Sequence, residues 1–118
     1  MTQIHKDIRI PFEIKGRRFE AVGFLDKGER SVDGDEMLSR ITKNNHRIID
    51  GDDVVFISKR FHLLPKKLHK FDLVTNLRKG DSPSSNMIFC CHYSVWGQFW
   101  SSLDYRWFKH ELVLCRLL

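Results

Sequence analysis

The chain has 118 residues and a formal net charge of +5, with 42% hydrophobic and 30% charged side chains. This length suits one domain that buries its own core, and the composition excludes a disordered or collagen-like chain. No run of about 18 apolar residues occurs, so we expect no membrane-spanning segment and no membrane partner. We therefore predict a single globular domain over residues 1–118.

The first residues and the cysteines indicate a cellular compartment. Residues 1–7 lack the apolar stretch that is typical of a secretory signal. The three cysteines are odd in number, and two of them, Cys90 and Cys91, are adjacent. Such a set does not form a disulfide framework. These features favour a cytoplasmic protein.

The N-terminal segment alternates between apolar and polar residues. Apolar side chains occupy every second position on both sides of the polar residues 15–17: Ile8, Ile10, Phe12 and Ile14 before them, and Phe19 and Ala21 after them. A period of two indicates a half-buried strand, and the glycine between the two runs favours a turn. The segment therefore predicts a β-hairpin.

Two similar phrases follow, residues 32–38 and 49–55, each with Asp-Gly-Asp followed by a further acidic residue. Asp33 with Glu36 three positions later is a capping-box pattern, and Asp50 with Asp53 is a weaker version. The phrases therefore predict two helix starts. We expect the first helix to bury Met37, Leu38 and Ile41, and the second to bury Val54, Val55 and residues 56–61.

The rest of the chain predicts strands. Pro65 favours a break at Leu64, with a short helical turn over 66–69. Alternation over 71–77 predicts a strand, and the polar residues 79–86 predict an exposed, mobile loop. Three further strands are expected over 87–95, 99–103 and 111–117, with a tight connection at Trp96-Gly97-Gln98.

The predicted fold class is therefore α+β. It comprises an N-terminal β-hairpin, two to three short helices, and a C-terminal antiparallel meander packed on the helices.

Aromatic residues are concentrated between Met87 and Phe108, which hold eight of the fourteen in the chain. Trp and Tyr supply much of the contact energy at protein interfaces, so we expect some of these rings to face a partner. The binding candidates are Trp96, Trp100, Tyr105 and Trp107. They favour a small non-enzymatic binding protein whose sheet surface contacts a protein partner or, as a homodimer, its own copy.

A basic segment offers a second function. Its cations are Lys59, Arg60, Lys66, Lys67, Lys70, Arg78 and Lys79. Lysines that follow phosphates beside aromatic rings that stack on bases would bind a single-stranded nucleic acid, with a steep salt dependence. The alternative prediction is therefore a nucleic-acid-binding accessory protein.

The acidic phrases offer a third function. If their carboxylates converged, Asp33, Asp35, Glu36, Asp50, Asp52 and Asp53 could hold a divalent cation in a metal-dependent hydrolase. Helix capping explains these residues better. The six histidines have no metal-ligand spacing, and no catalytic residue or cofactor motif is recognisable. These patterns favour a non-enzymatic protein over the hydrolase alternative, and they indicate no cofactor.

Some phrases resemble a group of short uncharacterised bacterial proteins. They are Ser31 to Leu38, the Leu64-Pro65-x-x-Leu68 phrase, and the Trp-rich C-terminal strands. The resemblance spans roughly residues 30–115. It implies a bacterial cytosolic domain, and it carries no known activity or catalytic residue.

Overall fold

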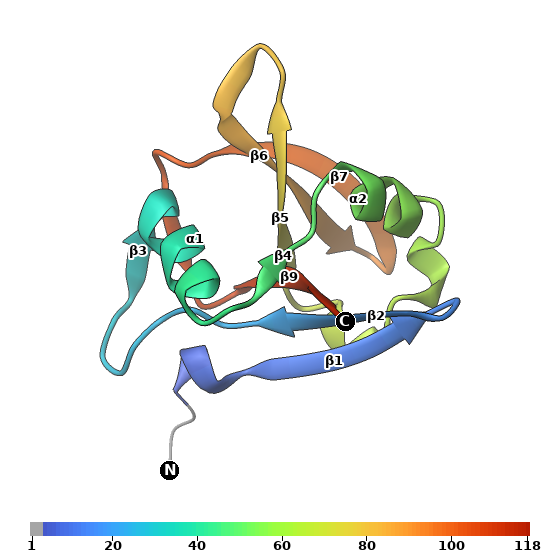
Figure 1. Ribbon diagram of the computed structural model, residues 1–118, viewed down its shortest axis with the longest axis horizontal. Helices are drawn as coiled ribbons and strands as arrows, with labels where there is room; N and C mark the ends of the chain where they lie inside the picture. The colour runs from blue at the N-terminus through green and yellow to red at the C-terminus, as the bar shows by residue number, and fades with distance from the viewer. Residues whose placement is uncertain (1–3) are drawn as a thin grey trace.

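The computed structural model describes residues 4–118, which form a large mixed β-sheet, a small two-stranded sheet and two α-helices (Figure 1). The strands are β1 (Arg9–Ile14), β2 (Arg17–Val22), β3 (Ser31–Asp33), β4 (Arg47–Ile48), β5 (Asp72–Lys79), β6 (Ser82–His92), β7 (Val95–Ser102), β8 (Arg106–Phe108) and β9 (Glu111–Leu117). The helices are α1 (Gly34–Lys43) and α2 (Gly51–Ser58), and 3₁₀ turns cover His5–Asp7, Phe61–Leu63 and Lys66–Leu68. The chain is α+β, as predicted, and rich in strand.

The last strand of the chain lies at the centre of the large sheet. The strand order is β1-β2-β9-β5-β6-β7, and the short β4 pairs with the C-terminal half of β9. β9 runs parallel to β5, whereas all the other strand pairs in this sheet are antiparallel. The hairpin predicted at the N-terminus is confirmed by the pairing of β1 with β2.

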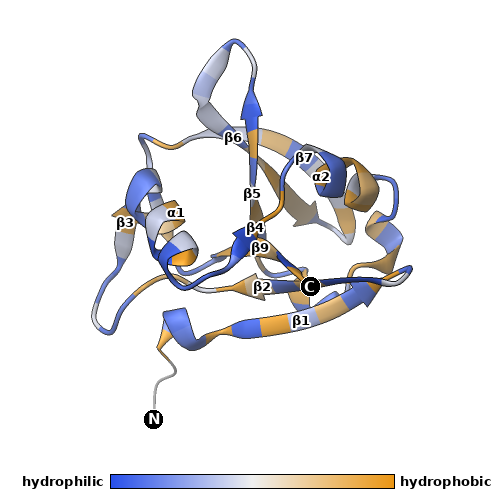
Figure 2. Cartoon of the chain, viewed as in Figure 1, coloured by the Kyte–Doolittle hydropathy of each residue, from blue (hydrophilic) through white to orange (hydrophobic). Residues whose placement is uncertain are grey.

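Each face of the sheet packs against one helix. Val113 and Cys115 of β9 belong to a core that contains Met37 and Ile41 of α1. The alternate residues of the same strand, Leu112 and Leu114, belong to a second core on the other face. That second core contains residues of α2, Val54 and Ile57. The alternation expected of a strand is visible in Figure 2 as orange and blue bands along β1.

Both predicted helix starts are confirmed. The side chain of Asp33 caps α1 by accepting a hydrogen bond from the Glu36 N–H at 2.8 Å. Asp50 occupies the N-cap of α2 without a side-chain capping bond. The buried face predicted for α1 is also confirmed. In α2 the expectation is wrong for Val55 and Lys59. Only one side of this short helix meets the sheet, so Val55 is 50% exposed, and Lys59 is exposed just after the helix ends at Ser58.

The predicted C-terminal meander is wrong in its last strand. β6 and β7 form an antiparallel hairpin, but β9 leaves that hairpin and inserts between β2 and β5. The physical reason is that residues 112–115 are buried and alternate between the two cores. A strand that buries both faces belongs inside a sheet that is covered on both sides.

Two local predictions in the same region are also wrong. The tight turn lies at Tyr93 and Ser94, which have φ angles of 52° and 65°, and Trp96-Gly97-Gln98 belongs to β7. Positive φ at both central residues is typical of the turn that best matches the twist of a hairpin. The predicted loop over 79–86 is instead the tip of the β5–β6 hairpin.

Arg40 links α1 to the connection between β2 and β3. Its guanidinium donates to the Glu29 carboxylate, to Glu36 Oε1 at 2.9 Å and to the Phe24 carbonyl at 3.0 Å. Hydrogen bonds from Arg40, with the backbone bond from Asp26, lower the pKa of Glu29 to about 2. The ionised form of Glu29 is therefore stabilised in the folded protein.

This link predicts an acid-dependent loss of stability. Because the folded-state pKa of Glu29 lies below the unfolded value of about 4.3, its contribution is present above that value and is lost as the pH falls toward about 2. We expect the free energy of unfolding of Glu29→Gln to fall less between about pH 6 and about pH 3 than that of the unsubstituted protein. Denaturant titrations at both pH values measure this. Glu13→Gln, at an exposed glutamate of β1, is the control, and the same pH dependence in both variants would contradict the prediction.

Candidate functional site

β7 is a free edge of the large sheet. It is the last strand in the sheet order and pairs only with β6 among residues 4–118. The opposite edge strand, β1, carries an exposed proline, Pro11, and the exposed charges Arg9 and Glu13. Proline and charge on an edge are common devices that discourage pairing with another chain. β7 has neither device, so its edge is open to a further strand.

The hairpin register identifies the backbone groups that face outward. In a two-residue hairpin the pairs bonded to the partner strand alternate with pairs that are not. The pair next to the turn, His92 with Val95, is a hydrogen-bonded pair, and every second pair along the hairpin is therefore bonded as well. The bond from the Leu103 N–H to the Ser84 carbonyl, at 2.7 Å, fits this series. Trp96, Gln98 and Trp100 therefore direct their N–H and C=O groups away from β6.

The β7 edge lies in a charge-free part of the chain. Residues 82–103, 22 in all, contain no Asp, Glu, Lys or Arg, although 30% of the whole chain is charged. Large apolar side chains are exposed there, with Phe99 at 49% and Trp100 at 42%. Phe99 pairs with Ile88 on the α1 face of the sheet, and Trp100 pairs with Met87 on the α2 face. Apolar surface is therefore present on both sides of the same edge.

The structure separates the four aromatic candidates. Trp100 and Tyr105 are exposed, and Trp96 is half-buried against Phe61, with 6.2 Å between the ring centroids. The prediction that Trp107 contacts a partner is wrong, because its side chain is only 1% exposed. β8 pairs with β3, and this places the Trp107 indole in the core with Met37 and Ile41 of α1.

The basic candidates fall into two groups. Arg78 and Lys79 lie near the tip of the β5–β6 hairpin, where Lys79 is 4.0 Å from Asp81. The other five lie between the end of α2 and the start of β5, within or beside the 3₁₀ turns of that segment: Lys59, Arg60, Lys66, Lys67 and Lys70. Of these, Arg60 places its guanidinium 4.1 Å from the centre of the Phe56 ring. Nucleic-acid binding by this segment stays a prediction.

The two acidic phrases do not converge. Asp33, Asp35 and Glu36 begin α1 on one face of the sheet, and Asp50, Asp52 and Asp53 begin α2 on the other. The carboxylate of Asp53 is buried and accepts from Arg17 at 3.0 Å and from Arg116 at 2.8 Å. The first phrase therefore caps a helix, and the second holds an ion-pair network.

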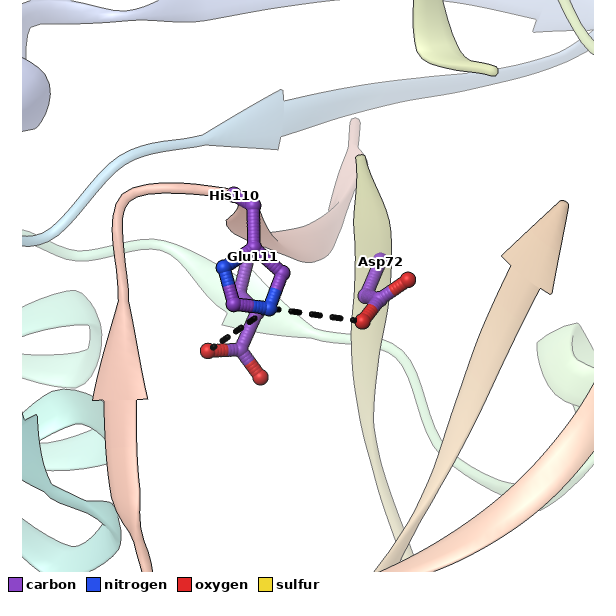
Figure 3. A group of neighbouring side chains, drawn as sticks. All are labelled: Asp72, His110 and Glu111. Carbon is purple, nitrogen blue, oxygen red and sulfur yellow. Dashed lines mark ion pairs between the residues drawn. The ribbon is translucent and has the colours of Figure 1, made fainter. Parts of the chain in front are cut away.

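A different cluster could hold a metal ion, and the sequence patterns did not indicate it. Asp72, His110 and Glu111 bring one nitrogen and two oxygens within 4.8 Å of one another (Figure 3). Asp72 begins β5 and Glu111 begins β9, and the parallel register places these two residues side by side. In the sequence the only signal is the adjacent His110 and Glu111, because Asp72 is brought to them by the pairing of distant strands.

Comparison with known proteins gives no functional information, so the functional proposal rests on the geometry of the structure. No protein-family model, curated protein or solved structure matches the chain. Within residues 4–118, neither helix has the length and apolar character needed to cross a membrane. The resemblance to short bacterial proteins stays a prediction.

Trp107 and Trp100 differ most in exposure among the tryptophans, so their substitution tests the environments assigned to them. Trp107→Ala should lower the free energy of unfolding by about 3–5 kcal/mol, because it leaves a cavity under α1. Trp100→Ala should lower it by about 1 kcal/mol or less, because much of that ring is already in solvent. Chemical denaturation at low protein concentration measures both values. Equal losses in the two variants would contradict these assigned environments.

Proposed function

We propose that this protein is a non-enzymatic binding protein that pairs the β7 edge with β7 of a second copy. The observation that carries the proposal is the free, charge-free edge of β7, flanked by exposed aromatic side chains. Addition of a strand to such an edge supplies backbone hydrogen bonds for affinity and side-chain contacts for specificity. The two copies would share one continuous sheet.

Charge favours a second copy as the occupant. Each copy carries +5, so the electrostatic cost of pairing is smallest where the contact itself brings no like charges together. The β7 edge is such a place, and it offers no charged group to select an acidic or basic partner. An uncharged segment that readily forms a strand is the matching partner, and β7 itself is such a segment. Twofold pairing of one strand with its own copy also closes the assembly at a dimer.

The outward backbone groups suggest a register. If Gln98 of each copy lies on the twofold axis, the outward groups of Trp96 in one copy meet those of Trp100 in the other. The two indoles then lie on the same face of the joined sheet. Directly opposed aromatic side chains on neighbouring strands contribute about 0.2–1 kcal/mol per pair. This register therefore adds two Trp96–Trp100 contacts to the backbone bonds.

The expected affinity is modest. β7 contributes eight residues, whereas a standard interface involves roughly 20–30 residues on each side. Nearby exposed rings, including Phe99 and Tyr105, add contact area without making the interface large. We therefore expect a dissociation constant on the order of 10–100 µM. The monomer and the dimer should exchange readily within this range.

Light-scattering chromatography over a series of protein concentrations tests the proposal. The unsubstituted protein should move from monomer to dimer mass as its concentration passes on the order of 100 µM, with little dependence on salt. Gln98→Lys should stay monomeric, because it places two like charges opposite each other at the centre of the interface. Gln98→Thr, which changes the same position without adding charge, should still dimerise.

Two results would count against this interface. One is an unsubstituted protein that remains monomeric throughout the series. The other is a Gln98→Lys variant that dimerises as well as Gln98→Thr. A complex that contains nucleic acid, detected by its 260/280 nm absorbance ratio, and that dissociates at high salt would instead favour the basic segment.

A further inference from the structure

The buried carboxylate of Glu111 lacks the arginine partner that the other buried carboxylates have. Glu20 accepts two hydrogen bonds from Arg9, at 2.7 and 3.2 Å, and Asp53 accepts from two arginines. The Glu111 side chain is only 9% exposed, and among residues 4–118 the one basic side chain within ion-pair distance of it is the imidazole of His110. Burying a carboxylate without a permanent positive charge is costly.

A second carboxylate adds to this negative charge. Asp72 Oδ2 lies 3.7 Å from His110 Nε2, and Glu111 Oε1 lies 3.8 Å from the same nitrogen. In Figure 3 the imidazole nitrogen stands between the two carboxylates. Two acidic groups therefore share one histidine.

Backbone hydrogen bonds join the residues of the cluster and hold the Glu111 side chain. The Asp72 N–H donates to the His110 carbonyl at 2.9 Å, which ties the start of β5 to the turn before β9. The Phe108 N–H donates to Glu111 Oε1 at 2.6 Å, which fixes the Glu111 carboxylate across the same turn. A site that rests on two paired central strands is more rigid than one on a loop, and rigidity favours ion binding.

The spacing of the three atoms suits a small cation. Ligands bound to Zn²⁺ at about 2.1 Å with tetrahedral angles lie about 3.4 Å apart. The separations of His110 Nε2 from the two carboxylate oxygens, 3.7 and 3.8 Å, are close to this value, and one ligand atom from each of the three residues lies within 4.8 Å of the others. One imidazole nitrogen with two carboxylate oxygens is a donor set that suits a divalent transition-metal ion. We infer that Asp72, His110 and Glu111 bind such an ion, with Zn²⁺ as the representative case.

Solvent can reach the cluster. The His110 side chain is 56% exposed, so an ion could enter from solution and complete its coordination with water.

Zinc titration of single-residue variants tests the site. Competition with a chromogenic chelator should find one Zn²⁺ bound per chain, and Co²⁺ in its place should give the visible absorption of a tetrahedral site. His110→Ala and Asp72→Asn should each weaken Zn²⁺ binding by at least about 10-fold. Loss of a residue that only supports a metal ligand already costs about this much, and these two residues are ligands themselves. His62→Ala, at an exposed histidine outside the cluster, is the matched control and should bind as the unsubstituted protein does.

Circular dichroism confirms that each variant is folded before it is titrated. The inference is overturned if the unsubstituted protein retains no Zn²⁺ at about 100 µM metal. It is also overturned if His110→Ala and Asp72→Asn bind as tightly as His62→Ala, because adventitious surface histidines would then account for the binding. These residues lie outside β7, so loss of metal binding and loss of dimerisation are separate outcomes.

Discussion

The fold depends on the burial of both faces of β9. Residues 112–115 alternate between two cores, one under α1 and the other under α2. A strand of this kind is stable only inside a sheet that is covered on both sides, and burial of its apolar side chains contributes roughly 1.5–3 kcal/mol for each. The last strand of the chain is therefore the centre on which β2, β4 and β5 assemble.

The central position of β9 also produces the two candidate sites. Because β9 pairs with β5 rather than with β7, the outer side of β7 has no partner strand within residues 4–118, and it carries exposed aromatic residues. Because β9 and β5 are parallel and in register, Asp72 and Glu111 meet at the start of both strands. Both candidate sites thus follow from the position of β9 between β2 and β5.

Local features of this fold could be predicted from the sequence, and long-range features could not. The hairpin and the helix starts depend on neighbouring residues, such as Asp33 and Glu36, so their patterns are visible in the chain. The central place of β9 depends on which strands cover it, and the burial of Trp107 depends on pairing between β8 and β3. Of the candidate sites, the aromatic residues were visible as a concentration of rings, but the free edge and the carboxylate–histidine cluster required the topology.

Hydrogen exchange of the β7 amides, measured at two protein concentrations, tests the central claim that this edge is open and pairs with a second copy. The outward amides of Trp96, Gln98 and Trp100 should exchange rapidly in dilute solution and become protected as the protein is concentrated, because pairing occupies them. The amides of Gly97 and Phe99, which face β6, should be protected at both concentrations. Outward amides that exchange equally fast at both concentrations would contradict the pairing of β7 with its copy.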